Sequence, residues 1–367
     1  MLTGALVAAA SLAGALYGYV HLPKFGALPA KSRQEAIDAS PYYRDGQFRN
    51  VQEIPVSIKK GGSAVTLFRY LTTKKDAPFP PAPIPAVKTD LAVLNPREDV
   101  LIWLGHSSLY LQVAGRRILV DPVFCENAAP VPGSNMAFAS THRFTANEIP
   151  LVDVLLITHD HWDHLDYGTI KALKNRVGIC ICPLGVGAHL ERWQVPVSKI
   201  AEADWNTKIP LADGLDIHLL PSRHFSGRFI AKNKTQWAAF AIITEKYKIF
   251  ISGDGGYGRH FKEIGKTFQG FDLAILECGQ YSHDWPHNHM KPEETAQAAL
   301  DLGARAVLPY HNSKYSIAYH SWDDPLNCIA VASRGKDYRL LTPIPGEPVA
   351  LDGSVQEFSR WWEHIGA

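Results

Sequence analysis

Short apolar runs that each end in a polar residue are the main pattern of the chain between residues 100 and 310. The runs at 100–104, 108–113 and 117–121 follow one another closely, and Ala114-Gly115-Arg116 between the last two is typical of a turn. This part of the chain therefore predicts three consecutive strands.

The same arrangement recurs further along the chain, where strands end next to residues that are able to bind metals. These expected strands cover residues 152–158, 215–221, 237–244, 248–252, 273–277 and 306–309. Helices are expected at 167–173 and 292–302. Strand ends that present polar side chains, with helices between them, predict a layered α/β domain whose site lies at one edge of its sheets.

An apolar run without a charged residue follows the first methionine and ends at residue 20. A helix over this run would approach the ~30 Å thickness of the hydrocarbon layer of a membrane. The first cations, beginning with Lys24, follow the run, which by the positive-inside rule places the rest of the chain in the cytoplasm. We therefore expect residues 1–20 to be a retained membrane anchor; the alternative is a cleaved or periplasm-directing signal segment.

The rest of the chain divides into three parts by composition. Residues 21–97 are expected to form an N-terminal extension with a short helix at 32–39. Its proline-rich stretch at 76–86 predicts a stiff linker or surface strap, because proline removes backbone donors and fixes φ. We place the main domain, which carries the polar strand ends, at residues 98–345 and a C-terminal tail at 346–367.

Composition excludes several classes of protein. The 367 residues are 46% hydrophobic and 20% charged, so the chain is able to bury a large core. Lysine plus arginine (37) nearly equals aspartate plus glutamate (36), and no basic cluster accompanies the polar strand ends, so no nucleic-acid partner is expected. Five scattered cysteines do not make a disulfide framework. The 16 histidines stand out because they cluster.

The strongest cluster follows the expected strand at 152–158. His159, His161, Asp163 and His164 lie within six positions of one another. Imidazole and carboxylate groups suit zinc and similar divalent ions. The first two histidines are able to converge on one ion if the loop bends, while Asp163 and His164 face a second position. A solvated polar loop is the alternative, but it gives no reason for four potential ligands to crowd together.

This H-x-H-x-D-H pattern resembles the signature of the metallo-β-lactamase superfamily, whose αββα four-layer sandwich holds one or two metals at the sheet edges. The similarity covers most of residues 98–330. Within the superfamily, the chain is most similar to N-acylphosphatidylethanolamine-hydrolysing phospholipase D and its bacterial membrane-associated relatives. That finer resemblance rests on residues 23–29, 40–46, 103–108, 119–124, 252–257, 271–275, 289–294 and 311.

The resemblance implies a complete set of ligands for two divalent metal ions. The first metal would be held by His159, His161 and His224, the second by Asp163, His164 and His311, and both by a bridging Asp254. The ligand types favour zinc, with iron or manganese as alternatives. Taken alone, His224 and His311 would each be read as an ordinary surface or core histidine, and Asp254 as a turn residue between glycines.

The resemblance also implies further roles around the metals. Asp254 would position an attacking hydroxide shared by the two ions, and His289 would protonate the leaving group, with His287 as its rival. His106 and Asp121 match positions behind the metals, where hydrogen bonds orient ligand imidazoles; strand-end turn chemistry is their alternative. An apolar wall for a lipid chain would be formed by Trp162, Tyr257, Tyr281 and Trp285. The alternative is that these four residues are ordinary core or loop aromatics.

These expectations favour a metal-dependent hydrolase that cleaves N-acylphosphatidylethanolamine-like phospholipids as a phosphodiesterase of the phospholipase D type. A lactone or β-lactam hydrolase with the same two-metal site is the first alternative, since both reactions need the same ligands. A non-catalytic, membrane-tethered metal-binding protein is the second. The sequence leaves the oligomeric state open, with a dimer among the alternatives.

Overall fold

The computed structural model describes residues 2–53, 72–73, 75–141, 143–228 and 231–366. The expected N-terminal extension is therefore only partly described, because its residues 54–71 and 74 lie outside these ranges. All statements below concern the described residues.

The first of two large sheets has seven strands in the order β16-β3-β4-β5-β6-β7-β8. Their bounds are β3 (Val100–Trp103), β4 (Leu109–Val113), β5 (Arg116–Val120), β6 (Val152–Leu156), β7 (Val177–Pro183), β8 (Ile200–Ala203) and β16 (Pro348–Ala350). The strands from β16 to β5 pair antiparallel, and those from β5 to β8 pair parallel. Because β5, β6 and β7 run in the same direction, their carboxyl ends meet at one edge.

The second sheet also has seven strands, in the order β15-β14-β13-β12-β11-β10-β9. Their bounds are β9 (Thr207–Pro210), β10 (Asp216–Leu220), β11 (Ala239–Ile243), β12 (Lys248–Ile251), β13 (Leu273–Glu277), β14 (Ala306–Tyr310) and β15 (Arg339–Leu340). The strands from β12 to β15 are parallel. Each strand expected from the sequence is present, within two residues of its expected ends.

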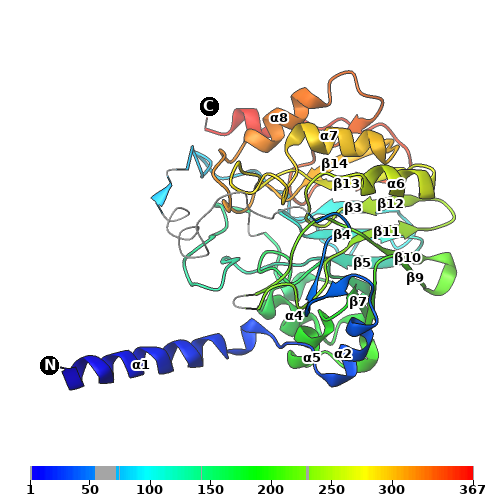
Figure 1. Cartoon of the computed structure of the whole chain (residues 1–367). Coiled ribbons are helices and arrows are strands. Elements are labelled where there is room, and N and C mark those ends of the chain that lie inside the picture. Colours follow the sequence, from blue (N-terminus) through cyan, green and yellow to red (C-terminus); the bar gives the residue numbers. More distant parts are fainter. Residues whose placement is uncertain (1, 54–71, 74, 142, 229–230, 367) are drawn as a thin grey trace.

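Helices cover the outer faces of both sheets (Figure 1). They are α4 (Tyr167–Leu173) and α5 (Gly187–Arg192) on the first sheet, and α6 (His260–Phe268), α7 (Pro292–Asp301) and α8 (Asp324–Ala332) on the second. One apolar cluster fills the space between the sheets. A second lies between the first sheet and its helices, and a third lies between the second sheet and its helices. The expected αββα sandwich is thereby confirmed.

Several short elements complete the fold. They are α2 (Lys31–Asp38), β1 (Tyr43–Arg44), β2 (Gln47–Phe48) and the 3-10 turns Pro23–Phe25, Ala146–Glu148, Val197–Lys199, Ala212–Gly214 and Trp361–His364. Residues 76–86 contain neither helix nor strand and run along the surface, where the Asp76 N–H donates to Tyr319 O at 3.1 Å. Ile84 anchors this strap because its side chain is fully buried.

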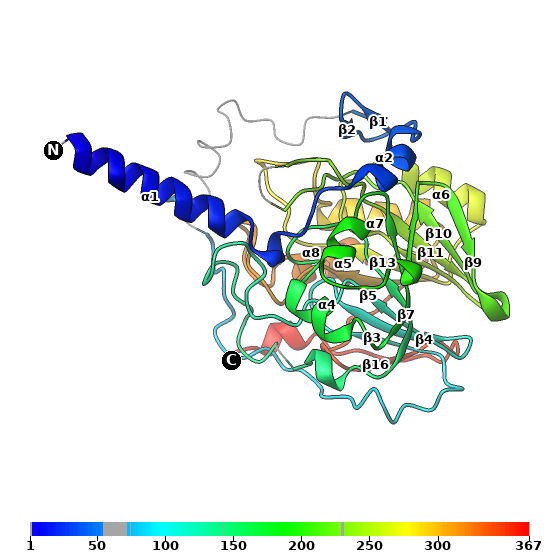
Figure 2. The same cartoon turned by 90° about the horizontal axis from the view of Figure 1, so that it is seen from below.

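The N-terminal helix α1 (Leu2–Val20) extends away from the body as a single rod (Figure 2). Its Leu6, Leu12 and Leu16 side chains are exposed. Among the described residues, no helix is both long and apolar enough to cross a membrane.

The last residues of the chain belong to the domain. β16 pairs antiparallel with β3, so the expected boundary at residue 345 falls just before a strand of the first sheet. Trp361 and Trp362 are buried in the cluster between the sheets. Residues 346–366 therefore close the sandwich, although their sequence lacks the long apolar runs of the other strands.

Gly346, at the turn that leads into β16, tests this closure. Its φ of +91° is rare for other residues, and a methyl group there would lie 1.9 Å from Val87 O. We expect Gly346→Ala to lower the free energy of unfolding by about 2–4 kcal/mol, from strain and overpacking together. Urea denaturation measures this, with Gly353→Ala as the control, because Gly353 also has a positive φ but open space around it. Equal losses for the two variants would contradict the expectation.

Candidate metal centre

The candidate ligands follow the ends of strands in both sheets, so the sandwich brings them to one edge. His159, His161, Asp163 and His164 follow β6; His224 follows β10; Asp254 follows β12; and His311 follows β14. Nearly all of these side chains are buried, and His161 is half-buried. Residues 152 positions apart in the chain, such as His159 and His311, thereby share one site.

A first group of ligand atoms is formed by His159, His161, His224 and Asp254. One potential ligand atom from each lies within 4.8 Å of the others. His161 Nδ1 is 2.9 Å from His159 Nε2 and 3.2 Å from His224 Nε2. Asp254 Oδ2 lies 3.9 Å from His159 Nε2 and 3.7 Å from His224 Nε2. This group matches the ligand set that the resemblance implied for the first metal.

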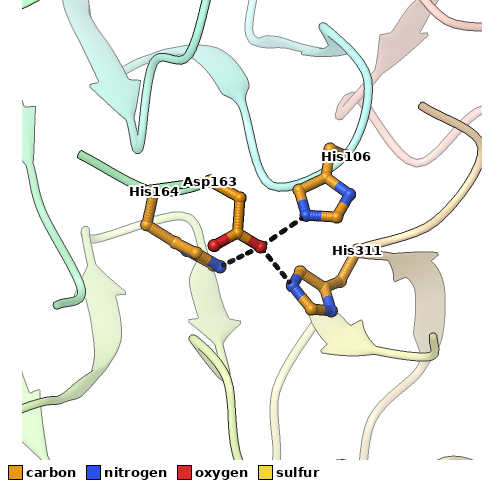
Figure 3. A group of neighbouring side chains, drawn as sticks. All are labelled: His106, Asp163, His164 and His311. Carbon is orange, nitrogen blue, oxygen red and sulfur yellow. Dashed lines mark hydrogen bonds and ion pairs between the residues drawn. The ribbon is translucent and has the colours of Figure 1, made fainter. Parts of the chain in front are cut away.

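A second group comprises His106, Asp163, His164 and His311 (Figure 3). Asp163 Oδ2 lies 2.8 Å from His106 Nε2, 3.2 Å from His311 Nε2 and 3.7 Å from His164 Nε2. His106, expected behind the metals, thus reaches the same carboxylate oxygen as two expected ligands. Its backbone has a φ of +51° and is held by the N–H of His311, which donates to His106 O at 3.0 Å.

Asp254 contacts both groups. Its Oδ1 is 3.0 Å from His164 Nε2, and its Oδ2 is 3.1 Å from His311 Nε2. Burial opposes ionisation of Asp254, but the imidazoles of His164 and His311 hold the pKa of its carboxyl well below its usual range. A charged carboxylate between two groups of imidazoles is the arrangement that a bridging ligand requires.

The donor set fits divalent cations. Burial and the nearby imidazoles hold the pKa of His159 and His224 well below its usual value, which keeps both rings in the neutral form that binds metal. Burial also opposes protonation of His311, yet the Asp254 and Asp163 carboxylates raise the pKa of His311 to about 10. These carboxylates favour positive charge at the second group, and a divalent ion supplies it.

Asp121 lies behind the second group, as the resemblance implied. Its fully buried Oδ2 is 2.8 Å from His164 Nδ1 and also accepts from Thr158 Oγ1 at 2.6 Å. Its Oδ1 accepts from the Thr158 N–H at 2.8 Å. With Nδ1 of His164 engaged in this way, its Nε2 faces Asp163 and Asp254.

His289 lies beside both groups and is oriented by a residue that the sequence did not single out. His289 Nδ1 is 2.5 Å from Oε1 of the buried Glu277, whose Oε2 accepts from the Gly255 N–H at 2.5 Å. Burial and the Asp254 carboxylate raise the pKa of Glu277 well above its usual range, while burial lowers the pKa of His289 to about 4. Both shifts favour a proton shared between the two neutral groups over a separated ion pair. Glu277 ends an apolar strand, and this position is the feature of the sequence from which its role could have been inferred.

Replacing Glu277 with glutamine should lower kcat by about 10- to 100-fold without loss of metal, because the amide keeps the shape of the side chain but removes the proton held by the pair. Steady-state kinetics together with metal analysis of the purified protein measure both quantities. Glu263→Gln, on the exposed side of α6, is the matched control. An unchanged kcat, or a loss of metal that accounts for the lower rate, would contradict this role.

The four aromatic candidates for a substrate wall contact different neighbours. Trp162 Nε1 donates to Arg228 O at 2.8 Å, and Trp285 Nε1 donates to Gln280 O at 2.9 Å. The remaining two hydroxyls, of Tyr257 and Tyr281, donate to Asp301 and Asp324 respectively. Among the described residues, no ring contact joins any two of the four. The rival proton donor His287 contributes its backbone oxygen to Arg223 Nε at 3.2 Å.

Comparison with known proteins places this arrangement in a family. Residues 116–312 match the family described as the Beta-lactamase superfamily domain. An uncharacterised Mycobacterium tuberculosis protein is 34% identical over 98% of this chain and 96% of its own length. A yeast (Saccharomyces cerevisiae) N-acyl-phosphatidylethanolamine-hydrolyzing phospholipase D is 30% identical over 57% of this chain and 46% of its own length.

Two further comparisons concern a relative named for a cellular location and a solved structure with a similar fold. A Klebsiella pneumoniae protein named outer membrane protein RomA is 58% identical over 28% of this chain and 78% of its own length. The structure of Igni18, a metallo hydrolase from Ignicoccus hospitalis, superposes with a TM-score of 0.53 and 20% identity, covering 71% of this chain and 99% of that chain. This likeness to Igni18 concerns the fold.

Proposed function

This chain belongs to the metallo-β-lactamase superfamily and is a metal-dependent hydrolase, and on this premise we propose that it cleaves N-acylphosphatidylethanolamine-like phospholipids as a phosphodiesterase of the phospholipase D type. The position of Asp254, in contact with both ligand groups and close to His289, carries this proposal. The similarity to the yeast phospholipase D supports the substrate class.

Two divalent cations would be held by the two ligand groups with Asp254 between them. Imidazole and carboxylate donors without thiolate favour zinc, with iron or manganese as alternatives. Such ions, when bound, lower the pKa of a water molecule and neutralise the charge that develops on phosphoryl oxygens. His106 would fix the orientation of Asp163 through the 2.8 Å contact to its Oδ2.

The protein residues would then move two protons. Asp254 orients the attacking water and accepts its proton as the water oxygen forms a bond to phosphorus. The phosphorus–oxygen bond to the N-acylethanolamine breaks, and the pair of His289 and Glu277 donates its proton to the departing oxygen. The products are phosphatidic acid and an N-acylethanolamine. Asp254 then releases its proton to the solvent, and the pair of His289 and Glu277 takes up a proton from the solvent in place of the one it donated.

We also propose that α1 brings the enzyme to a membrane surface. Its exposed leucines and Tyr17 offer apolar contact area, and the relative named an outer membrane protein is consistent with such a location. Attachment to a surface that contains the substrate raises its local concentration without new contacts in the site. The cytoplasmic side follows from Lys24 and the later cations, with the periplasm as the alternative.

The test uses the full chain, purified in mild detergent and loaded with zinc, and vesicles that contain N-acylphosphatidylethanolamine. Mass spectrometry should detect phosphatidic acid and N-acylethanolamine in equal amounts, and an Asp254→Asn sample excludes a contaminating lipase. Absence of both products from protein shown by metal analysis to hold two ions would refute the phospholipid substrate. Hydrolysis of lactones by the same sample would then identify the alternative reaction.

A further inference from the structure

A second buried polar network lies directly behind the metal-binding loop, and Asp160 is its centre. Asp160 stands between the candidate ligands His159 and His161, but it is only 2% exposed, and its carboxylate contacts residues outside both ligand groups. Its Oδ1 accepts from the Gly227 N–H at 2.7 Å. Its Oδ2 accepts from Thr235 Oγ1 at 2.9 Å and lies 3.2 Å from His189 Nε2.

Arg228 connects the backbone of the same loop to the segment that follows α1. Its guanidinium donates to Asp160 O at 2.8 Å, to Leu165 O at 2.7 Å and to Lys24 O at 2.9 Å. It also lies 4.0 Å from the centre of the Trp162 ring, within cation–π distance. One buried arginine thus contacts the metal-binding loop at three places, together with the segment that follows α1.

The segment after α1 also determines the hydrogen-bonding state of His189. The Ala27 N–H donates to His189 Nδ1 at 3.1 Å, so the proton of a neutral ring lies on Nε2 and points at Asp160. Phe25 packs its ring edge against Trp162, with the centroids 5.2 Å apart. The network therefore connects the residues after α1 with the loop that carries four candidate ligands.

We propose that Asp160 is a positioning residue of the metal centre, which fixes the metal-binding loop to the segment after α1 through His189, Thr235, Gly227 and Arg228. The inference rests on the proposed metal-binding function. Three groups donate hydrogen bonds to the Asp160 carboxylate, and both of its oxygens accept. An amide at this position accepts through one oxygen only and presents an N–H group to a neighbouring donor, so the loop must shift.

The test measures cobalt binding by the full chain carrying Asp160→Asn. Cobalt(II) reports on ligand geometry through its visible absorption, which a role limited to stability does not change. We expect a dissociation constant about 10- to 100-fold higher than in the unsubstituted protein, together with an altered spectrum. Gln112→Met is the matched control, because Gln112 is also buried and donates to Asn95 O and Glu98 O. It lies near the end of β4 that is farther from His106. It should lower Tm and leave the spectrum unchanged.

Two further variants keep the test decisive if Asp160→Asn does not fold. His189→Leu and Thr235→Val each remove one hydrogen-bond donor to the carboxylate, and weaker cobalt binding in both supports the inference. Affinity within twofold and an unchanged spectrum in all folded variants, with Tm lowered as in Gln112→Met, would overturn it. Absence of cobalt binding by the unsubstituted protein would overturn the proposed function itself, and this inference with it.

Discussion

Replacing Asp254 with asparagine should lower kcat/KM by roughly 10³-fold or more and reduce the bound metal below two ions per chain. The substitution removes the negative charge that both ligand groups share. The imidazoles of His164 and His311, 3.0 Å and 3.1 Å away, lose the carboxylate that attracts positive charge to this position. Steady-state kinetics on metal-saturated protein and metal analysis of the same sample measure the two effects.

Asp216→Asn is the matched control for this experiment. Asp216 begins β10, at the far end of that strand from His224, and pairs with Lys208 at 2.6 Å. Activity and metal content should be unchanged there, since exposed ion pairs contribute little. A protein with Asp254→Asn that retains two ions and more than a tenth of the activity would show that Asp254 neither bridges nor takes the proton of the water.

Replacing His289 with glutamine should lower kcat for a phospholipid by about 10²- to 10³-fold while leaving the metal content unchanged. In this variant no side chain delivers the proton held with Glu277 to the departing alkoxide. The loss should shrink to less than about tenfold for an ester with a nitrophenol leaving group, because that anion departs without a proton. The comparison of the two substrates measures proton donation directly.

His287→Gln provides the control, since His287 is the rival from the same segment and contacts Arg223 only through its backbone oxygen. Equal losses for both substrates in the His289 variant would indicate a structural role. A loss of metal would instead make His289 a ligand, which its position next to Asp254 and His311 allows. A large effect at His287 would reverse the assignment.

The strands β3 to β6 and β10 to β14 were predictable because each is an apolar run of the right length that ends at a polar residue, whereas β7, β8, β9, β15 and β16 were not expected. The loop from His159 to His164 was predictable for the same reason, as four ligand types crowd into six positions after β6. His224, Asp254 and His311 have no such local signal. Each follows a different strand of the second sheet, and only the resemblance to a family connected them with the loop before the structure was known.

The resemblance identified His106 and Asp121, which act through other residues, but sequence reasoning missed Glu277 and Asp160. Each of these two is a single acid, and their contacts with His289 and Thr235 join residues 12 and 75 positions apart in the chain. Asp160 also stands between two candidate ligands, which drew attention away from it.

The pairing of β16 with β3 has a consequence for synthesis of the protein. The edge of β3 stays without its partner until the ribosome has made residues 348–350, long after β3 itself. An open strand edge is a template for pairing with another chain. Between the synthesis of β3 and that of β16, the nascent chain therefore presents an aggregation-prone edge, and we expect it to depend on chaperones during this interval.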